Sequence, residues 1–295
     1  MNSADRALSA IALAVMAMAL FSLMDVIVKL LGEGYHVAQL LLFRSAITFL
    51  PALWIMRQEG GWPSLRTRHP WLHLGRSVLT FGFTACMFVA VNRMPLADVY
   101  AVSYLAPLLI TALSVPVLGE HVGVRRWVAI VIGLIGILVI LRPGGGILGI
   151  GAVIVLAGTM MYAVGILLTR LLSRTDGNGL LLLHYAVVAT IGAGVVQPWV
   201  WVTPNLTDLM LMFAAGGLGA IGQLMVIQAF RLGEAGLIAP FQYTTILWGL
   251  GFGWVFFGDQ PDGVTLIGAG IVIASGLYIL HRERVRYRTS IVTPR

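Results

Sequence analysis

Charged and titratable side chains lie inside otherwise apolar segments, and these are the residues that could do chemistry. Asp25 and Lys29 stand four residues apart in LFSLMDVIVKLL (20–31), and Arg44 lies in the next apolar segment. Charged groups in such surroundings pair with one another or face a water-filled site. We predict an Asp25–Arg44 ion pair, with Lys29 sharing the carboxylate one helical turn away. These residues form either a structural staple between two helices, or an outer-side gate or a site that contacts a zwitterionic substrate.

His184 and Tyr185 form a second polar position in a later apolar segment. An imidazole changes charge in the physiological pH range, so His184 is a candidate for proton exchange. A single histidine can equally be a hydrogen-bonded structural group, and both interpretations stay open.

Aromatic and amide side chains in the apolar segments could line a cavity, because flat rings contact apolar groups while hydroxyl and amide groups bind polar ones. Helix packing or anchoring at the membrane interface is the alternative for each of them. The candidate lining residues are Tyr104, Tyr162, Gln223, Gln242, Tyr243 and Trp248.

The elements that position these residues are membrane helices. Hydrophobic residues make up 59% of the 295-residue chain and charged residues only 11%, against about a quarter charged in soluble domains. Segments of 18 or more mostly apolar residues are long enough to cross the bilayer. We predict an all-α integral membrane protein with ten transmembrane helices: 8–31, 37–56, 72–92, 97–117, 124–141, 147–171, 179–202, 208–231, 236–256 and 263–281.

The distribution of basic residues predicts the topology. With ten helices both termini share one side, and 15 of the 19 basic residues fall on that side. The positive-inside rule places it in the cytoplasm. The net charge of +7 therefore indicates topology rather than nucleic-acid binding.

The two halves of the chain resemble one another. VAVNRMPLADVYAVSYLAP (89–107) is similar to IQAFRLGEAGLIAPFQY (227–243), and matched positions along the halves are offset by 138 to 141 residues. We predict two five-helix repeats, 8–141 and 147–281. Because five is odd, the second repeat enters the membrane from the opposite side, so the repeats are inverted, with a central cavity between them.

The inverted repeat predicts two polar layers that flank this cavity. The outer layer is Asp25, Arg44, Tyr100 and Tyr104. The inner layer is His184, Tyr185, Gln242 and Tyr243. Pro107 and Pro240 each remove a backbone hydrogen bond within a predicted helix, and they act either as hinges or as static kinks.

Several classes of function lack their motifs. The glycines of LRPGGGILG (141–149) are not followed by Gly-Lys-Ser/Thr, so no ATP site is expected. No metalloprotease motif, nucleophile elbow or metal-binding pair of aspartates occurs, so we expect neither an enzyme nor a cofactor.

The chain resembles ten-helix drug/metabolite transporters of the EamA type over about residues 8–281. The resemblance is carried by the paired halves, Leu118-Gly119-Glu120, ILRPGG (140–145) and APFQYTTILWGLGFGWVFFGD (239–259). It implies a secondary transporter in the cytoplasmic membrane that exports small amphipathic metabolites, most often neutral or aromatic amino acids. Import of a metabolite such as S-adenosylmethionine or riboflavin, or a passive channel, is the alternative. Proton coupling and oligomeric state stay open.

Overall fold

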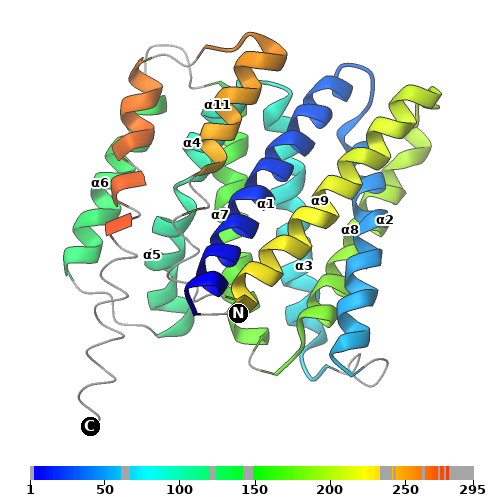
Figure 1. Ribbon diagram of the computed structural model, residues 1–295, viewed down its shortest axis with the longest axis horizontal. Coiled ribbons are helices and arrows are strands. Elements are labelled where there is room, and N and C mark those ends of the chain that lie inside the picture. Colours follow the sequence, from blue (N-terminus) through cyan, green and yellow to red (C-terminus); the bar gives the residue numbers. More distant parts are fainter. Residues whose placement is uncertain are drawn as a thin grey trace. The chain divides into compact units, whose positions relative to one another are not determined.

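The computed structural model describes residues 3–60, 67–119, 124–141, 149–173, 175–232, 241, 244–260, 263–271, 273–275 and 277–278. All regular structure in these ranges is helical (Figure 1). The helices are α1 (Ser3–Leu31), α2 (Val37–Gln58), α3 (Pro70–Val91), α4 (Leu96–Ser103), α5 (Ala106–Leu118), α6 (Val124–Leu141), α7 (Ile150–Leu172), α8 (Asn178–Val200), α9 (Leu206–Leu232) and α11 (Thr244–Phe257).

The described helices coincide with the predicted membrane spans. Within the described residues, seven segments are long and apolar enough to cross a membrane, and each matches one predicted span. The remaining three predicted spans coincide with shorter apolar helices, Trp127–Gly136, Thr244–Phe257 and Gly263–Ser275. The prediction of an all-helical membrane protein is thereby confirmed.

The fourth predicted span is interrupted. Helix α4 ends at Ser103, α5 begins at Ala106, and Pro107 stands in the first turn of α5. Proline has no N–H for the carbonyl four residues earlier, and its ring clashes with that carbonyl, so the helix breaks just before it. The side chain of Pro107 and the whole of Pro240 lie outside the described residues, and the hinge role of both stays a prediction.

The described chain divides into two compact units. Unit 1 comprises Met1–Ala19, Pro95–Gly149 and Met225–Arg295, and unit 2 comprises Leu20–Met94 and Ile150–Leu224. Each unit therefore takes segments from both halves of the sequence. The repeat boundaries 8–141 and 147–281 describe an internal sequence similarity, and they stay a prediction.

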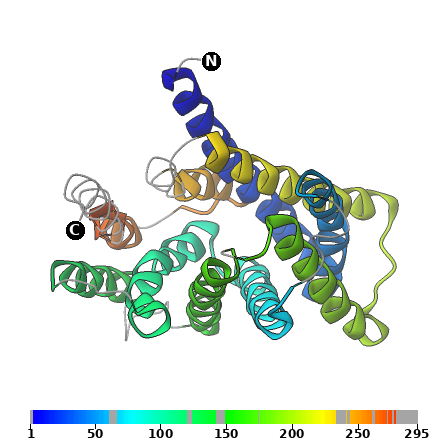
Figure 2. The ribbon, with the colours of Figure 1, turned by 90° about the horizontal axis from the view of Figure 1, so that it is seen from below.

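In unit 2, α2 and α8 lie side by side and antiparallel (Figure 2). At one end, the Gln39 side chain donates to the Val202 carbonyl at 2.8 Å and accepts from the Val202 N–H at 3.1 Å. At the other end, the Glu59 carboxylate accepts hydrogen bonds from the N–H groups of Asn178 and Gly179, at 3.1 and 2.7 Å. The carboxylate thus satisfies free N–H groups at the start of α8, where negative charge is favourable.

Small residues bring the other helices of unit 2 into close contact. A methyl group on Gly158 of α7 would lie 2.7 Å from Cβ of Cys86 in α3, and the rings of Phe83 and Tyr162 pack with centroids 4.7 Å apart. The absence of a side chain lets membrane helices approach closely.

Unit 1 contains the break in the fourth span and α11. Helices α4 and α11 pack together, and the ring of Tyr100 occupies the space that a side chain on Gly249 would need. The Tyr104 hydroxyl accepts a hydrogen bond from the Ile246 N–H at 2.8 Å. Tyr104 thus satisfies a free N–H group in the first turn of α11.

Candidate functional site

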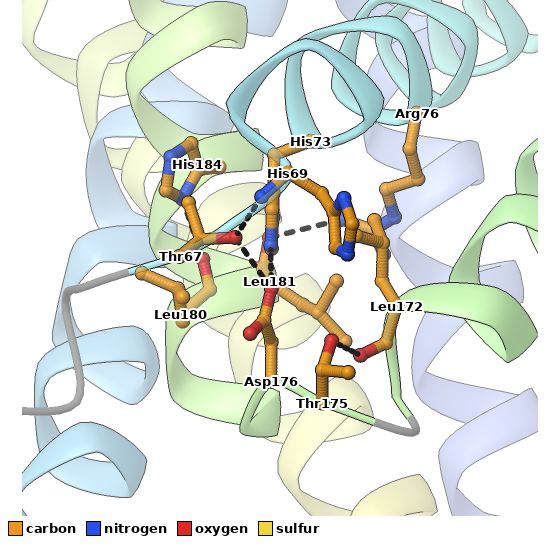
Figure 3. A network of polar contacts seen from close by, with 10 residues as sticks. All are labelled: Thr67, His69, His73, Arg76, Leu172, Thr175, Asp176, Leu180, Leu181 and His184. Atoms are coloured by element: carbon orange, nitrogen blue, oxygen red, sulfur yellow. Dashed lines mark hydrogen bonds and ion pairs between the residues drawn. The ribbon is translucent and has the colours of Figure 1, made fainter.

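Two groups of polar contacts lie among the helices of unit 2. We call the first the loop-end network, because it joins the start of α3 to the segment between α7 and α8. It comprises Thr67, His69, His73, Arg76, Asp176, Leu181 and His184, which Figure 3 shows, together with Thr169 of α7. We call the second the mid-helix network, and it comprises Arg44, Thr84, Phe88 and Tyr185.

Asp176 is the centre of the loop-end network. Its Oδ2 atom accepts from the Thr67 hydroxyl at 2.7 Å and lies 2.7 Å from Nε2 of His73. The Asp176 side chain is 5% exposed and that of His73 is fully buried. Because a carboxylate only accepts hydrogen bonds, Nε2 of His73 carries the proton in this contact.

The environment of Asp176 favours its ionised form. Burial alone would raise the pKa of this carboxyl group, but hydrogen bonds from His73 and Thr67 outweigh burial and lower its pKa below the ordinary value of 3.8. Asp176 is therefore an anion at neutral pH, which provides a fixed negative charge beside the ring of His73.

His73 and His184 lie against one another. Their ring centroids are 4.5 Å apart with planes tilted by 32°, and Nδ1 of His184 lies 3.0 Å from the Leu180 carbonyl. Since a carbonyl only accepts, Nδ1 of His184 carries a proton. The two rings therefore pack α3 against α8 at this end of unit 2.

Arg76 connects three helices in the loop-end network. Its Nε donates to the Thr169 hydroxyl at 3.1 Å and its Nη1 donates to the Leu181 carbonyl at 2.9 Å. The Thr169 hydroxyl in turn donates to the Gly165 carbonyl. Arg76 therefore ties α3 to α7 and α8 at this end of unit 2.

In the mid-helix network, Nη1 of Arg44 donates to the Tyr185 hydroxyl at 3.3 Å. The Tyr185 hydroxyl also lies 3.4 Å from that of Thr84. The guanidinium group lies over the ring of Phe88, 5.5 Å from its centroid, a cation–π contact. Arginine, phenol and hydroxyl thus meet between α2, α3 and α8.

The contact between Arg44 and Tyr185 corrects their assignment to separate outer and inner layers. Each residue lies seven positions inside its helix, about 10 Å from opposite ends at 1.5 Å per residue. The hydrocarbon layer is about 30 Å thick, so the backbones of Arg44 and Tyr185 differ in depth by about 10 Å. Two long side chains can span this distance.

The predicted Asp25–Arg44 pair is not the contact that Arg44 makes. Among the described residues, the Arg44 guanidinium contacts Tyr185 and Phe88. Asp25 is 7% exposed, and Asp25 and Lys29 each have an interaction partner. A gate or staple role for these residues stays a prediction.

The other predicted cavity residues divide between the units. Tyr162 of α7 packs on Phe83, and Gln223 of α9 is half-buried, both in unit 2. In unit 1, Trp248 stacks on Phe252 with centroids 5.8 Å apart, and its Nε1 is buried without a hydrogen-bond partner among the described residues. Gln242 and Tyr243 lie outside the described residues.

Sequence reasoning missed the contact between His73 and Asp176. The sequence did contain a clue to this contact. The predicted topology places the segment before the third span on the same side of the membrane as the segment between the sixth and seventh spans. No group of three histidine, cysteine or acidic side chains that could hold a metal ion occurs in the described part of the chain.

Residues 8–142 match the family model of the EamA-like transporter family. The chain is 29% identical over 281 residues to the pseudopaline exporter CntI of Pseudomonas aeruginosa, which covers 94% of this chain and 97% of the relative. It is 28% identical to the S-adenosylmethionine uptake transporter of Rickettsia conorii, over 88% of each chain. It is 26% identical to the riboflavin transporter of Rhizobium johnstonii, over 91% of this chain and 89% of the relative.

The fold is also similar to a known one. A solved structure, described only as a crystal structure of a protein, matches with a TM-score of 0.65 at 19% identity, over 94% of this chain and 98% of the other. The family and these named relatives are transporters rather than enzymes. Residues 8–142 are therefore similar to the EamA-like transporter family, and the chain is similar over most of its length to proteins named as transporters.

Proposed function

We propose that the protein is a secondary transporter that exports small amphipathic metabolites, with neutral or aromatic amino acids as the expected cargo, across the bacterial inner membrane by alternating access. The observation that carries this proposal is the mid-helix network. A guanidinium group, a phenol hydroxyl and an aromatic face meet about 10 Å inside predominantly apolar helices. Polar groups placed this deep in membrane helices mark solute pathways.

Paired helix contacts in unit 2 support the inverted repeat. Gly219 of α9 approaches Met24 of α1. The offsets between the two halves of the sequence relate Met24 to position 165 and Gly219 to about position 81, so the repeat predicts a matching contact between these two positions. Gly165 of α7 indeed lies against Thr80 of α3. The contact of Phe21 with Gly222 maps in the same way onto positions 162 and 84, beside the ring contact of Tyr162 with Phe83. Inverted repeats are typical of carriers that work by alternating access.

Export is tested with purified protein reconstituted in liposomes that are preloaded with labelled L-amino acids. We expect efflux that saturates with internal concentration and prefers the L over the D enantiomer, because a carrier binds its solute in each cycle. Protein-free liposomes provide the control for leakage. Flux that rises linearly with concentration and does not distinguish enantiomers would contradict the carrier and indicate a channel.

Import is the second candidate, because two relatives are named as an uptake transporter for S-adenosylmethionine and a transporter for riboflavin. The same liposomes distinguish it when they are loaded with buffer and given labelled S-adenosylmethionine or riboflavin outside. Saturable accumulation of either compound, without efflux of any amino acid, would replace the export proposal. A pH gradient applied in both experiments tests proton coupling through the paired imidazoles of His73 and His184.

A further inference from the structure

Arg44 has hydrogen-bonding capacity that the described protein groups do not use. A guanidinium group carries five N–H donors. Among the described residues, Arg44 makes a single side-chain hydrogen bond, to the Tyr185 hydroxyl at 3.3 Å, and one ring contact, with Phe88. Most of its donors therefore have no acceptor in this part of the chain.

Arg76 shows how unit 2 treats an arginine that only holds helices together. Two of its nitrogens donate to protein oxygens, at 3.1 and 2.9 Å, on two different helices. Arg44 receives no such pair of acceptors, although it lies deeper inside its helix. A cation at that depth is costly unless an anion or water satisfies it, so the surroundings of Arg44 fit a site for a ligand.

The neighbours of Arg44 pack closely around it and hold its side chain in place. Position 219 of α9 is a glycine, and a methyl group there would lie 3.5 Å from Nε of Arg44 and 3.0 Å from Sδ of Met24. The Phe88 ring and the Tyr185 hydroxyl restrict the orientation of the guanidinium group. An oriented guanidinium group matches the two oxygens of a carboxylate, with which it forms paired, charge-assisted hydrogen bonds.

We propose that Arg44 binds the carboxylate group of the transported solute, and that Tyr185 and Phe88 hold the guanidinium group in position. This inference rests on the proposed transport function and narrows its substrate class to carboxylate-bearing metabolites. The apolar and aromatic surroundings then contact the remainder of the solute, as amino acids with large apolar side chains require. A solute that lacks a carboxylate loses the contact with Arg44 and binds more weakly.

The test measures binding to purified protein in detergent by the change in tryptophan fluorescence. L-phenylalanine, L-leucine and L-methionine are each compared with their own carboxamides, which keep the side chain and the amine. We expect the wild-type protein to bind each acid at least about tenfold more tightly than its amide, because hydrogen bonds to charged groups are the stronger ones.

Three variants locate the effect. Arg44→Gln should remove the preference for the acid, whereas Arg44→Lys should keep part of it, because lysine retains the charge without the paired donors. Arg76→Gln is the matched control, since the nitrogens of Arg76 are engaged by Thr169 and Leu181. This control should keep the ratio of acid to amide affinity even if the variant is less stable. Monodispersity in size-exclusion chromatography establishes that each variant is folded.

Equal binding of acids and amides by the wild-type protein would overturn the assignment of Arg44, and so would a preference that survives Arg44→Gln. Neither result would affect a saturable flux in liposomes. If folded wild-type protein binds none of the acids or amides, the carboxylate site fails together with the amino-acid cargo of the proposed function. The two failures are therefore distinguishable.

Discussion

Arg76 and Arg44 lie on the neighbouring helices α3 and α2 of unit 2, yet their surroundings differ. Arg76 belongs to the loop-end network, where Asp176, Thr67 and His73 are joined by contacts of 2.7 Å. Arg44 belongs to the mid-helix network, where the polar contacts measure 3.3 and 3.4 Å. The loop-end network thus has more polar contacts than the mid-helix network, and its contacts are shorter.

On the proposed account, the loop-end network stabilises unit 2 and the mid-helix network binds the solute. In the loop-end network, most polar groups are paired between α3, α7, α8 and the segment that joins α7 to α8, so we expect their main effect to be to hold these elements together. The mid-helix network retains unused donors beside an aromatic ring, which is the arrangement expected of a ligand site. Substitutions should therefore change stability in the first network and solute binding in the second.

The largest effect is expected from Asp176→Asn. This change removes the charge that accepts hydrogen bonds from Thr67 and His73, and it should lower the free energy of unfolding by about 3 kcal/mol. Denaturant unfolding in detergent measures it. His69→Ala is the control, because His69 joins the network through its backbone N–H and its side chain is exposed. An unchanged unfolding free energy in Asp176→Asn would break the distinction between the networks.

Acid should weaken the loop-end network selectively. The pKa of Asp176 in the folded protein lies below its ordinary value of 3.8, so its ionised form stabilises the fold at all higher pH. This stabilisation is lost as the pH falls below 3.8 through the folded pKa. The midpoint temperature of thermal unfolding should therefore fall more steeply between pH 5 and about pH 3 in the wild-type protein than in Asp176→Asn. If the unfolding temperatures of the two proteins fell in parallel with pH, the charge of Asp176 would not contribute to stability.

A pair of adjacent glycines tests whether α9 packs on α2 beside Arg44. A methyl group on Gly216 would collide with the Ile47 side chain, whereas nothing lies within 4 Å of one on Gly217. Gly216→Ala should cost about 1 to 3 kcal/mol of stability through overpacking. Gly217→Ala should be neutral or slightly stabilising, because alanine favours helix. Equal stability of the two variants would contradict this packing.

The smallest effect is expected from Tyr185→Phe, which removes the hydroxyl group that contacts Arg44 and keeps the ring. Losing one such hydrogen bond costs about 1 kcal/mol, or about fivefold in affinity for the carboxylate ligand. The KM of efflux from liposomes measures this change. A variant with unaltered KM and a loss of stability as large as that of Asp176→Asn would assign Tyr185 to structure instead.

The sequence predicted the helices well because hydrophobic length alone determines which segments can cross a bilayer. The predicted span 37–56 corresponds to Val37–Gln58, and the predicted span 179–202 corresponds to Asn178–Val200. The interruption after Ser103 also follows from local chemistry, since Pro107 cannot donate a backbone hydrogen bond.

The contacts of the site were less predictable, because position along a helix gives depth but not the direction in which a side chain points. Asp25 and Arg44 have matching depths, yet Arg44 turns to Tyr185, which is 141 residues away. The hydroxyl of Tyr104 accepts a hydrogen bond from the first turn of α11, a contact that the sequence did not predict, and its role in lining a cavity stays a prediction. The His73–Asp176 contact joins a helix to a segment 103 residues later, so it depends on tertiary packing.

Counterflow in liposomes tests the central claim, alternating access by a carrier, most directly. Vesicles are preloaded with a high concentration of unlabelled L-phenylalanine and diluted into a trace of the labelled compound. A carrier returns from each export step with labelled solute, so the account predicts transient accumulation of label above its equilibrium level, and none with the D enantiomer inside and outside. Label that enters only to its equilibrium level, in vesicles shown to export L-phenylalanine, would contradict alternating access.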